Sequence, residues 1–190
     1  NNFLINIPQT IINCISLVSW IKSKISKQTE DDIYDYLDVY TEIDIDASTE
    51  LVRSKFLEFS KWSKWCKVIP EIKIISGDID NLETKPKLDL TLDFGRKKDP
   101  QKSPMNPIVS VNSKDVFVWG IYNGFLIKAE HVFVFEPINN FRGTHLIHYE
   151  RMTGIFSPFI ITKKVKKNMT NRYNIMNQNL KKFVNNNSLY

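Results

Sequence analysis

FVWGIYNGFLIKAEHVFVFEPINNFRGTHLIHYERMTG, residues 117–154, is the stretch of the sequence that decides the fold. Apolar and aromatic side chains alternate with their neighbours in three runs, within residues 116–121, 130–135 and 144–152. Such alternation, in segments rich in β-branched and aromatic residues, predicts strands. Turn-forming residues separate the runs, with a glycine after the first run and an Asn-Asn pair after the second. We therefore expect three consecutive antiparallel strands.

Polar side chains occupy one face of this predicted sheet together with large apolar ones. The alternation places Trp119, His131, His148 and Glu150 on the same face, whereas His145 should point outward. A polar group that is buried without a hydrogen-bond partner destabilises the fold. This face is therefore predicted to hold either a structural hydrogen-bond network or the polar end of a binding site.

The segments before this stretch predict a longer sheet and two helices. Ser48 is a good N-cap for a helix that includes residues 49–60, and Trp62 and Trp65 suggest a second, short helix. Residues 96–104 are polar and contain prolines, which predicts a solvent-exposed loop. The remaining alternating segments predict strands at 39–46, 71–78, 88–94 and 108–112.

The sequence after the three strands predicts one long helix. Ser157 and Pro158 suit a helix cap and a first helical position, and apolar residues then recur every three or four positions as far as Val184. This pattern predicts a single helix of about 27 residues. An amphipathic helix of this length needs a partner surface for its apolar side, and the predicted sheet is the only large surface available. We expect an α+β fold in which a curved antiparallel sheet wraps around the C-terminal helix, with a cavity between them.

The predicted domain covers residues 39–185, followed by a frayed tail at 186–190. Residues 1–38 are expected to be an amphipathic helical extension, whose apolar run at 11–21 is too short and too polar to span a bilayer. Its apolar stripe could pack on the domain or lie in a membrane interface.

Charge and cysteine content limit the partners and the compartment. The formal net charge is +5, and basic residues cluster at 163–167 and at Lys181-Lys182. These residues suit a solvated helix face or a surface for anionic lipid or another acidic partner, whereas no nucleic-acid-binding motif is present. Cys14 and Cys66 are far apart and do not have a metal-binding spacing, which favours free thiols and a cytoplasmic protein.

Several short motifs occur along the chain, namely Ala47-Ser48, Trp65, Trp119-Gly120, Glu130–Phe133 and Thr144–Gly154. Together they resemble the SRPBCC superfamily, which has the START-like helix-grip fold, and most closely its polyketide-cyclase-like branch. The resemblance covers about Val39 to Val184. It implies a hydrophobic pocket for a lipid, sterol, polyketide or similar small molecule. The superfamily includes lipid carriers, cyclases, receptors and co-chaperones, so the fold leaves the function open.

We therefore expect a binder or carrier of a hydrophobic small molecule, with neither a cofactor nor a metal. The candidate ligand-binding residues are Trp119, His131, Phe133, His148, Glu150, Trp65 and Phe94. One alternative is a cyclase or hydrolase that uses the His131, His148 and Glu150 cluster for acid–base chemistry. Another is a co-chaperone-like or membrane interaction module, acting through the N-terminal helix or the basic C-terminal helix.

Overall fold

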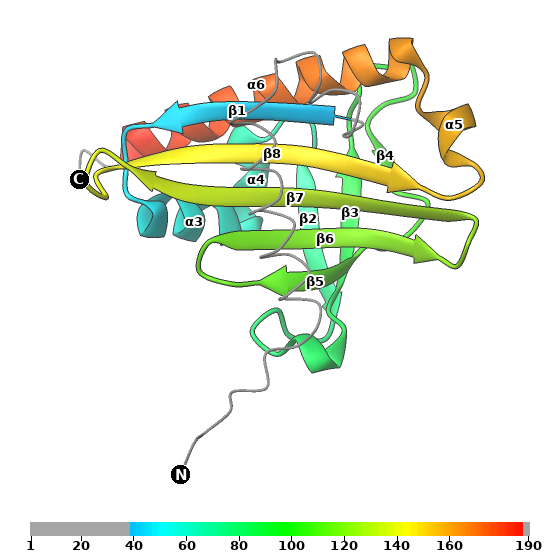
Figure 1. Ribbon diagram of the computed structural model, residues 1–190, viewed down its shortest axis with the longest axis horizontal. Coiled ribbons are helices and arrows are strands. Elements are labelled where there is room, and N and C mark those ends of the chain that lie inside the picture. Colours follow the sequence, from blue (N-terminus) through cyan, green and yellow to red (C-terminus); the bar gives the residue numbers. More distant parts are fainter. Residues whose placement is uncertain (1–38, 188–190) are drawn as a thin grey trace, which may run out of the picture. The chain divides into compact units, whose positions relative to one another are not determined.

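The computed structural model describes residues 39–187 (Figure 1). The predictions for residues 1–38, including the amphipathic helix and the Cys14 thiol, and for the tail at 188–190 lie outside the described residues. In chain order, the elements are β1 (Val39–Ile45), α3 (Thr49–Leu57), a 3-10 turn (Phe59–Lys61), α4 (Trp62–Trp65), β2 (Glu71–Ser76), a 3-10 turn (Leu82–Thr84), β3 (Lys87–Leu92), β4 (Gln101–Lys102), β5 (Ile108–Asn112), β6 (Val116–Asn123), β7 (Ile127–Ile138), β8 (Gly143–Thr153), α5 (Ser157–Ile160) and α6 (Lys163–Asn187).

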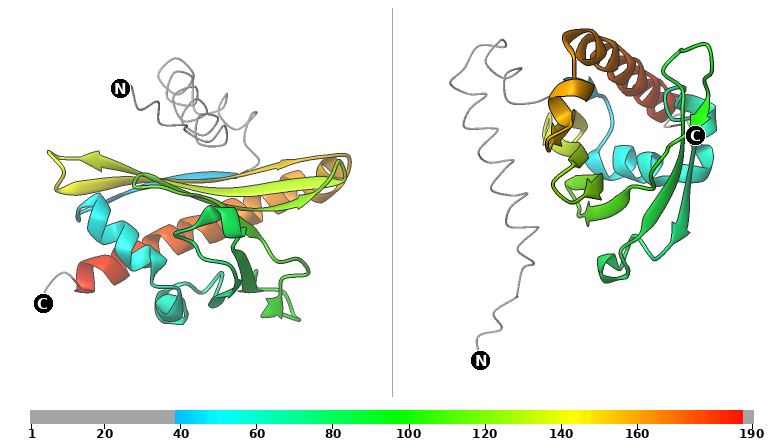
Figure 2. Two further views of the ribbon diagram at one scale, coloured as in Figure 1. Left: turned by 90° about the horizontal axis from the view of Figure 1, so that it is seen from below. Right: turned by 90° about the vertical axis from the view of Figure 1, so that its right-hand side faces the viewer.

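The strands form one antiparallel sheet in the order β1-β8-β7-β6-β5-β3-β2, and β4 pairs with β3. Figure 2 shows α3, α4 and α6 on the same side of the sheet. Helix α6 contacts β1, β8, α3 and α4. This arrangement confirms the predicted helix-grip α+β fold. Among the described residues, no helix combines the length and apolar character needed to cross a membrane.

The register of the three central strands agrees with the predicted face. Trp119 on β6 pairs with His131 on β7, and His131 pairs with Glu150 on β8. One step along the same face, Phe133 pairs with His148. Since side chains at paired positions share a face, the polar and aromatic residues of the three strands lie side by side.

The C-terminal segment corrects the prediction of one uninterrupted helix. Helix α5 has four residues, and α6 begins at Lys163, where the Thr162 hydroxyl accepts a hydrogen bond from the backbone N–H of Val165. Ser157 does not cap a helix, because its hydroxyl donates to the carbonyl of Gly154. A cap at Thr162 thus starts a new helix instead of extending the first one.

Two predicted boundaries also change. Helix α6 continues through Asn187, two residues past the predicted end of the domain at 185. The segment 96–104 is not entirely loop, because Gln101 and Lys102 pair with β3.

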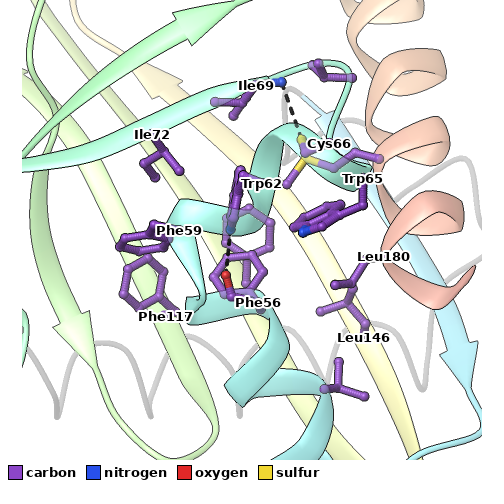
Figure 3. Close-up of a cluster of buried hydrophobic side chains, with 14 of the residues drawn as sticks. Phe56, Phe59, Trp62, Trp65, Cys66, Ile69, Ile72, Phe117, Leu146 and Leu180 are labelled. Atoms are coloured by element: carbon purple, nitrogen blue, oxygen red, sulfur yellow. Dashed lines mark hydrogen bonds between the residues drawn. The ribbon is translucent and has the colours of Figure 1, made fainter. Parts of the chain in front are cut away.

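An aromatic core fills the space between α3, α4 and the sheet (Figure 3). Phe56 of α3 is fully buried, and its ring lies 5.2 Å from Trp62, 5.5 Å from Phe117 and 4.7 Å from Phe133. The indole N–H of Trp62 donates to the carbonyl of Phe56. Cys66 is buried beside this core, and burial raises the pKa of its thiol to about 12. The thiol is therefore an inert part of the packing.

Phe56→Ala should lower the free energy of unfolding by about 3–5 kcal/mol, because it leaves a cavity at the centre of this aromatic core. Phe141→Ala is the control, since Phe141 is 68% exposed in the β7–β8 turn. Urea unfolding of both variants measures the difference. Equal losses in the two variants would contradict this description of the core.

Candidate functional site

A cavity of about 120 Å³ lies between the sheet and the N-terminal half of α6. Its wall is mainly apolar, with a polar group on one side formed by His131, Glu150 and Tyr173. The lining residues are Val68, Ile69, Leu90, Leu92, Phe94, Ser103, Pro107, Trp119, Gly120, Ile121, Ala129, His131, Glu150, Met169 and Tyr173. A site with this lining suits a small apolar molecule that carries a polar group.

The Glu150 carboxylate is the centre of the polar group, and it is only 4% exposed. The Tyr173 hydroxyl donates to Oε2 of Glu150 at 2.5 Å, and Nε2 of His131 lies 3.0 Å from the same oxygen. The Tyr173 oxygen is also 2.7 Å from Nε2 of His131. One side chain from α6 and one from β7 therefore converge on a carboxylate that projects from β8.

These contacts determine the protonation states. Burial alone would raise the pKa of Glu150, but His131 and the Tyr173 hydroxyl together hold it below its usual value. Burial, reinforced by the Glu150 charge, raises the pKa of Tyr173 well above its usual value. At neutral pH the site therefore contains an ionised carboxylate and a protonated phenol.

A second polar network lies beside the first and is fully enclosed. His148 is inaccessible to solvent, with its ring centroid 4.2 Å from that of Phe133 and 4.4 Å from that of Tyr173. Its Nδ1 lies 3.1 Å from the side-chain oxygen of Asn177, and the Asn177 amide donates to the Thr41 hydroxyl at 2.9 Å. Nδ1 therefore carries the proton and donates. This network attaches α6 to β1 and β8.

The structure divides the predicted site residues into two groups. Phe94, Trp119, His131 and Glu150 line the cavity. The other three are not on its wall: the Phe133 ring stacks on His148, His148 stacks on Tyr173 in the enclosed network, and Trp65 contacts Trp62 and Phe183.

Two residues that position the site were not among the predicted site residues. Tyr173 and Asn177 lie four positions apart on the buried side of α6, where each hydrogen bonds to the sheet network. A buried Asn at a stripe position of an amphipathic helix is the signal that could have indicated a polar partner across the interface.

The chemistry open to the site is that of hydrogen bonding and proton transfer. Within residues 39–187, no group of three His, Cys, Asp or Glu side chains is placed to hold a metal ion. Nδ1 of His131 is buried and has no hydrogen-bond partner in the described structure. His131 therefore has Nε2 engaged with Glu150, and its Nδ1 has unused hydrogen-bonding capacity.

Comparison with solved structures identifies the fold. A START superfamily protein from Mycobacterium smegmatis matches with a TM-score of 0.60 and 17% identity, over 78% of this chain and 97% of that protein. A Thermus thermophilus protein matches with a TM-score of 0.60 and 16% identity, over 79% and 98% of the two chains. The aromatase/cyclase Zhui from a Streptomyces species matches with a TM-score of 0.56 and 7% identity, over 77% and 92%.

These matches assign the chain to the START-like fold class and include aromatase/cyclases among its structural neighbours. No family model matches the sequence, and no curated protein matches it either.

The His148 environment predicts a pH-dependent stability. Burial, and then the nearby His131, lower the pKa of His148 well below its ordinary 6.5. The unfolded chain therefore binds the proton first, so stability falls as the pH drops below about 6.5, by up to about 1.4 kcal/mol per pH unit. His148→Gln should remove this slope between pH 6.5 and pH 5 in urea titrations. An unchanged slope would show that His148 is not held in its neutral form.

Proposed function

We propose that this protein binds a small hydrophobic molecule with one hydrogen-bonding group in the cavity under α6. The observation that carries the proposal is the Glu150 carboxylate, paired with His131 and Tyr173, on the wall of a mainly apolar cavity. Both contacts to Glu150 fall on Oε2, which leaves Oε1 to accept a hydrogen bond from a ligand. Apolar burial would supply affinity, and the carboxylate would orient the ligand.

The size of the cavity sets the size of the ligand in this conformation. A volume of about 120 Å³ is below the roughly 300–1,000 Å³ of typical ligand pockets, and it is close to the engineered cavity of ~150 Å³ that binds benzene. The cavity therefore suits one ring or a short chain. A whole lipid or sterol would require the wall to open, for example by displacement of Phe94 or Met169.

The structural neighbours, a START superfamily protein and aromatase/cyclases among them, share the fold that encloses the cavity. At sequence identities of 7–17% they support the fold alone, so the proposal of a bound ligand rests on the cavity and its polar wall.

Benzene and phenol form a matched pair of probes for the cavity. Phenol should bind about tenfold more tightly or better, because its hydroxyl can hydrogen bond to the charged Glu150. Ala129→Leu, which fills the cavity, should abolish binding of both probes, and Glu150→Gln should reduce the preference for phenol. Titrations of ¹⁵N-labelled protein followed by NMR measure the affinities. Binding of neither probe at millimolar concentration, or equal affinities for both, would contradict the proposal.

A second candidate function is proton transfer to and from a bound carbonyl compound, as in a cyclase. The observation that favours it is the unpartnered Nδ1 of His131 in a ring whose Nε2 lies 3.0 Å from Glu150. Nδ1 would remove a proton from the carbon next to the carbonyl, and the carboxylate would stabilise the resulting imidazolium. The proton returns from the same nitrogen at the end of the reaction.

Exchange of the α-protons of cyclopentanone in D₂O tests this second function by NMR. The protein should accelerate the exchange, and His131→Ala should return the rate to that of buffer. His145→Ala is the matched control, because His145 lies on the outer face of β8 beside Asp44. A rate that His131→Ala leaves unchanged would exclude His131 as the base.

A further inference from the structure

One end of the sheet carries a cluster of exposed apolar side chains that neither polar network explains. Its members come from the β6–β7 turn and from the segment between β8 and α6. We name this cluster the apex; it consists of Phe125 (75% exposed), Ile155, Phe156, Phe159 (80% exposed) and Ile160. A contiguous exposed group of this size usually marks an interaction surface.

The two segments of the apex are joined by backbone hydrogen bonds. The N–H of Ile155 donates to the carbonyl of Phe125 at 3.2 Å, and the N–H of Phe156 donates to the carbonyl of Leu126 at 3.2 Å. Gly154 has a φ of +108°, and a Cβ there would lie 2.6 Å from the Leu126 carbonyl oxygen. The close approach requires glycine, so the apex is a built feature of the fold.

The chain immediately after the apex is strongly basic. Lys163, Lys164 and Lys167 at the start of α6 are exposed. Residues 151–190 contain eight Lys and Arg and no Asp or Glu, so no acidic residue of this segment offsets their charge. Exposed aromatic and aliphatic side chains bordered by lysines match the chemistry of an anionic bilayer surface, which has an apolar interior below negative headgroups.

We infer that the apex docks on an anionic lipid membrane. Phe125 and Phe159 insert among the headgroups, and the lysines at the start of α6 pair with the negatively charged headgroups. The position of the cavity agrees with this orientation. Its lining residues Ile121 and Ala129 pair with each other only two residue pairs before the β6–β7 turn. A docked membrane would therefore lie next to one end of the cavity, although the docking itself does not depend on ligand binding.

Vesicle flotation of the full chain tests the inference. The vesicles are phosphatidylcholine alone and an equimolar mixture of phosphatidylcholine and phosphatidylserine. The wild-type protein should float with the mixed vesicles, and the double variant Phe125→Ser/Phe159→Ser should bind them about tenfold more weakly or worse. The double variant Lys163→Gln/Lys164→Gln should lose about fivefold in affinity for the mixed vesicles per lysine replaced. Raised salt should also weaken the binding of the wild type to these vesicles.

The chain offers a matched control for each variant. Phe141→Ser removes an exposed phenylalanine from the β7–β8 turn at the opposite end of the strands, and Lys64→Gln/Lys182→Gln removes two exposed lysines far from the apex. Both controls should bind like the wild type. The inference is overturned if the wild type does not bind mixed vesicles, if the apex variants bind them like the wild type, or if the controls lose as much as the apex variants. Retained binding by the apex variants would indicate that another part of the chain, such as residues 1–38, binds the vesicles.

Discussion

The buried carboxylate of Glu150 is the constraint on which the arrangement of helix and sheet depends. An ionised group in the interior costs several kcal/mol unless hydrogen bonds and opposite charge compensate it. Here the compensation comes from two other elements, His131 on β7 and Tyr173 on α6. Four residues further along α6, Asn177 bonds to Thr41 and His148. These contacts determine where α6 lies along the sheet, because a shift of one turn would leave both networks without partners.

The position of α6 and the aromatic core together decide where a ligand could lie. Phe56, Trp62 and Trp65 fill the space between α3, α4 and the sheet. The cavity lies at the N-terminal half of α6, where Met169 and Tyr173 of the helix face Trp119, His131 and Glu150 of the sheet across it. The aromatic core and the cavity with its polar wall therefore occupy different parts of the space between the helices and the sheet.

The sequence predicted the fold better than it predicted the site. Alternation in residues 117–154 was sufficient to align Trp119, His131 and Glu150, because side chains of paired strands must share a face. The alternation could not distinguish cavity wall from core. A tryptophan such as Trp65 suits either place, and only its packing against Phe183 in the folded protein shows that it belongs to the core. Tyr173 and Asn177 were not identified as site residues because the register of a helix on a sheet is a tertiary property. The break before Lys163 was missed because Thr162 fits a helical position as well as a cap.

Ligand binding by this protein requires that Glu150, His131 and Tyr173 form the polar wall of a cavity that a ligand can enter. A crystal structure of the protein soaked in phenol tests this claim directly. We predict density for one ring under α6, beside Trp119, with its oxygen within hydrogen-bond distance of the Glu150 carboxylate. A cavity filled by protein side chains, or phenol found only on the surface, would contradict the account.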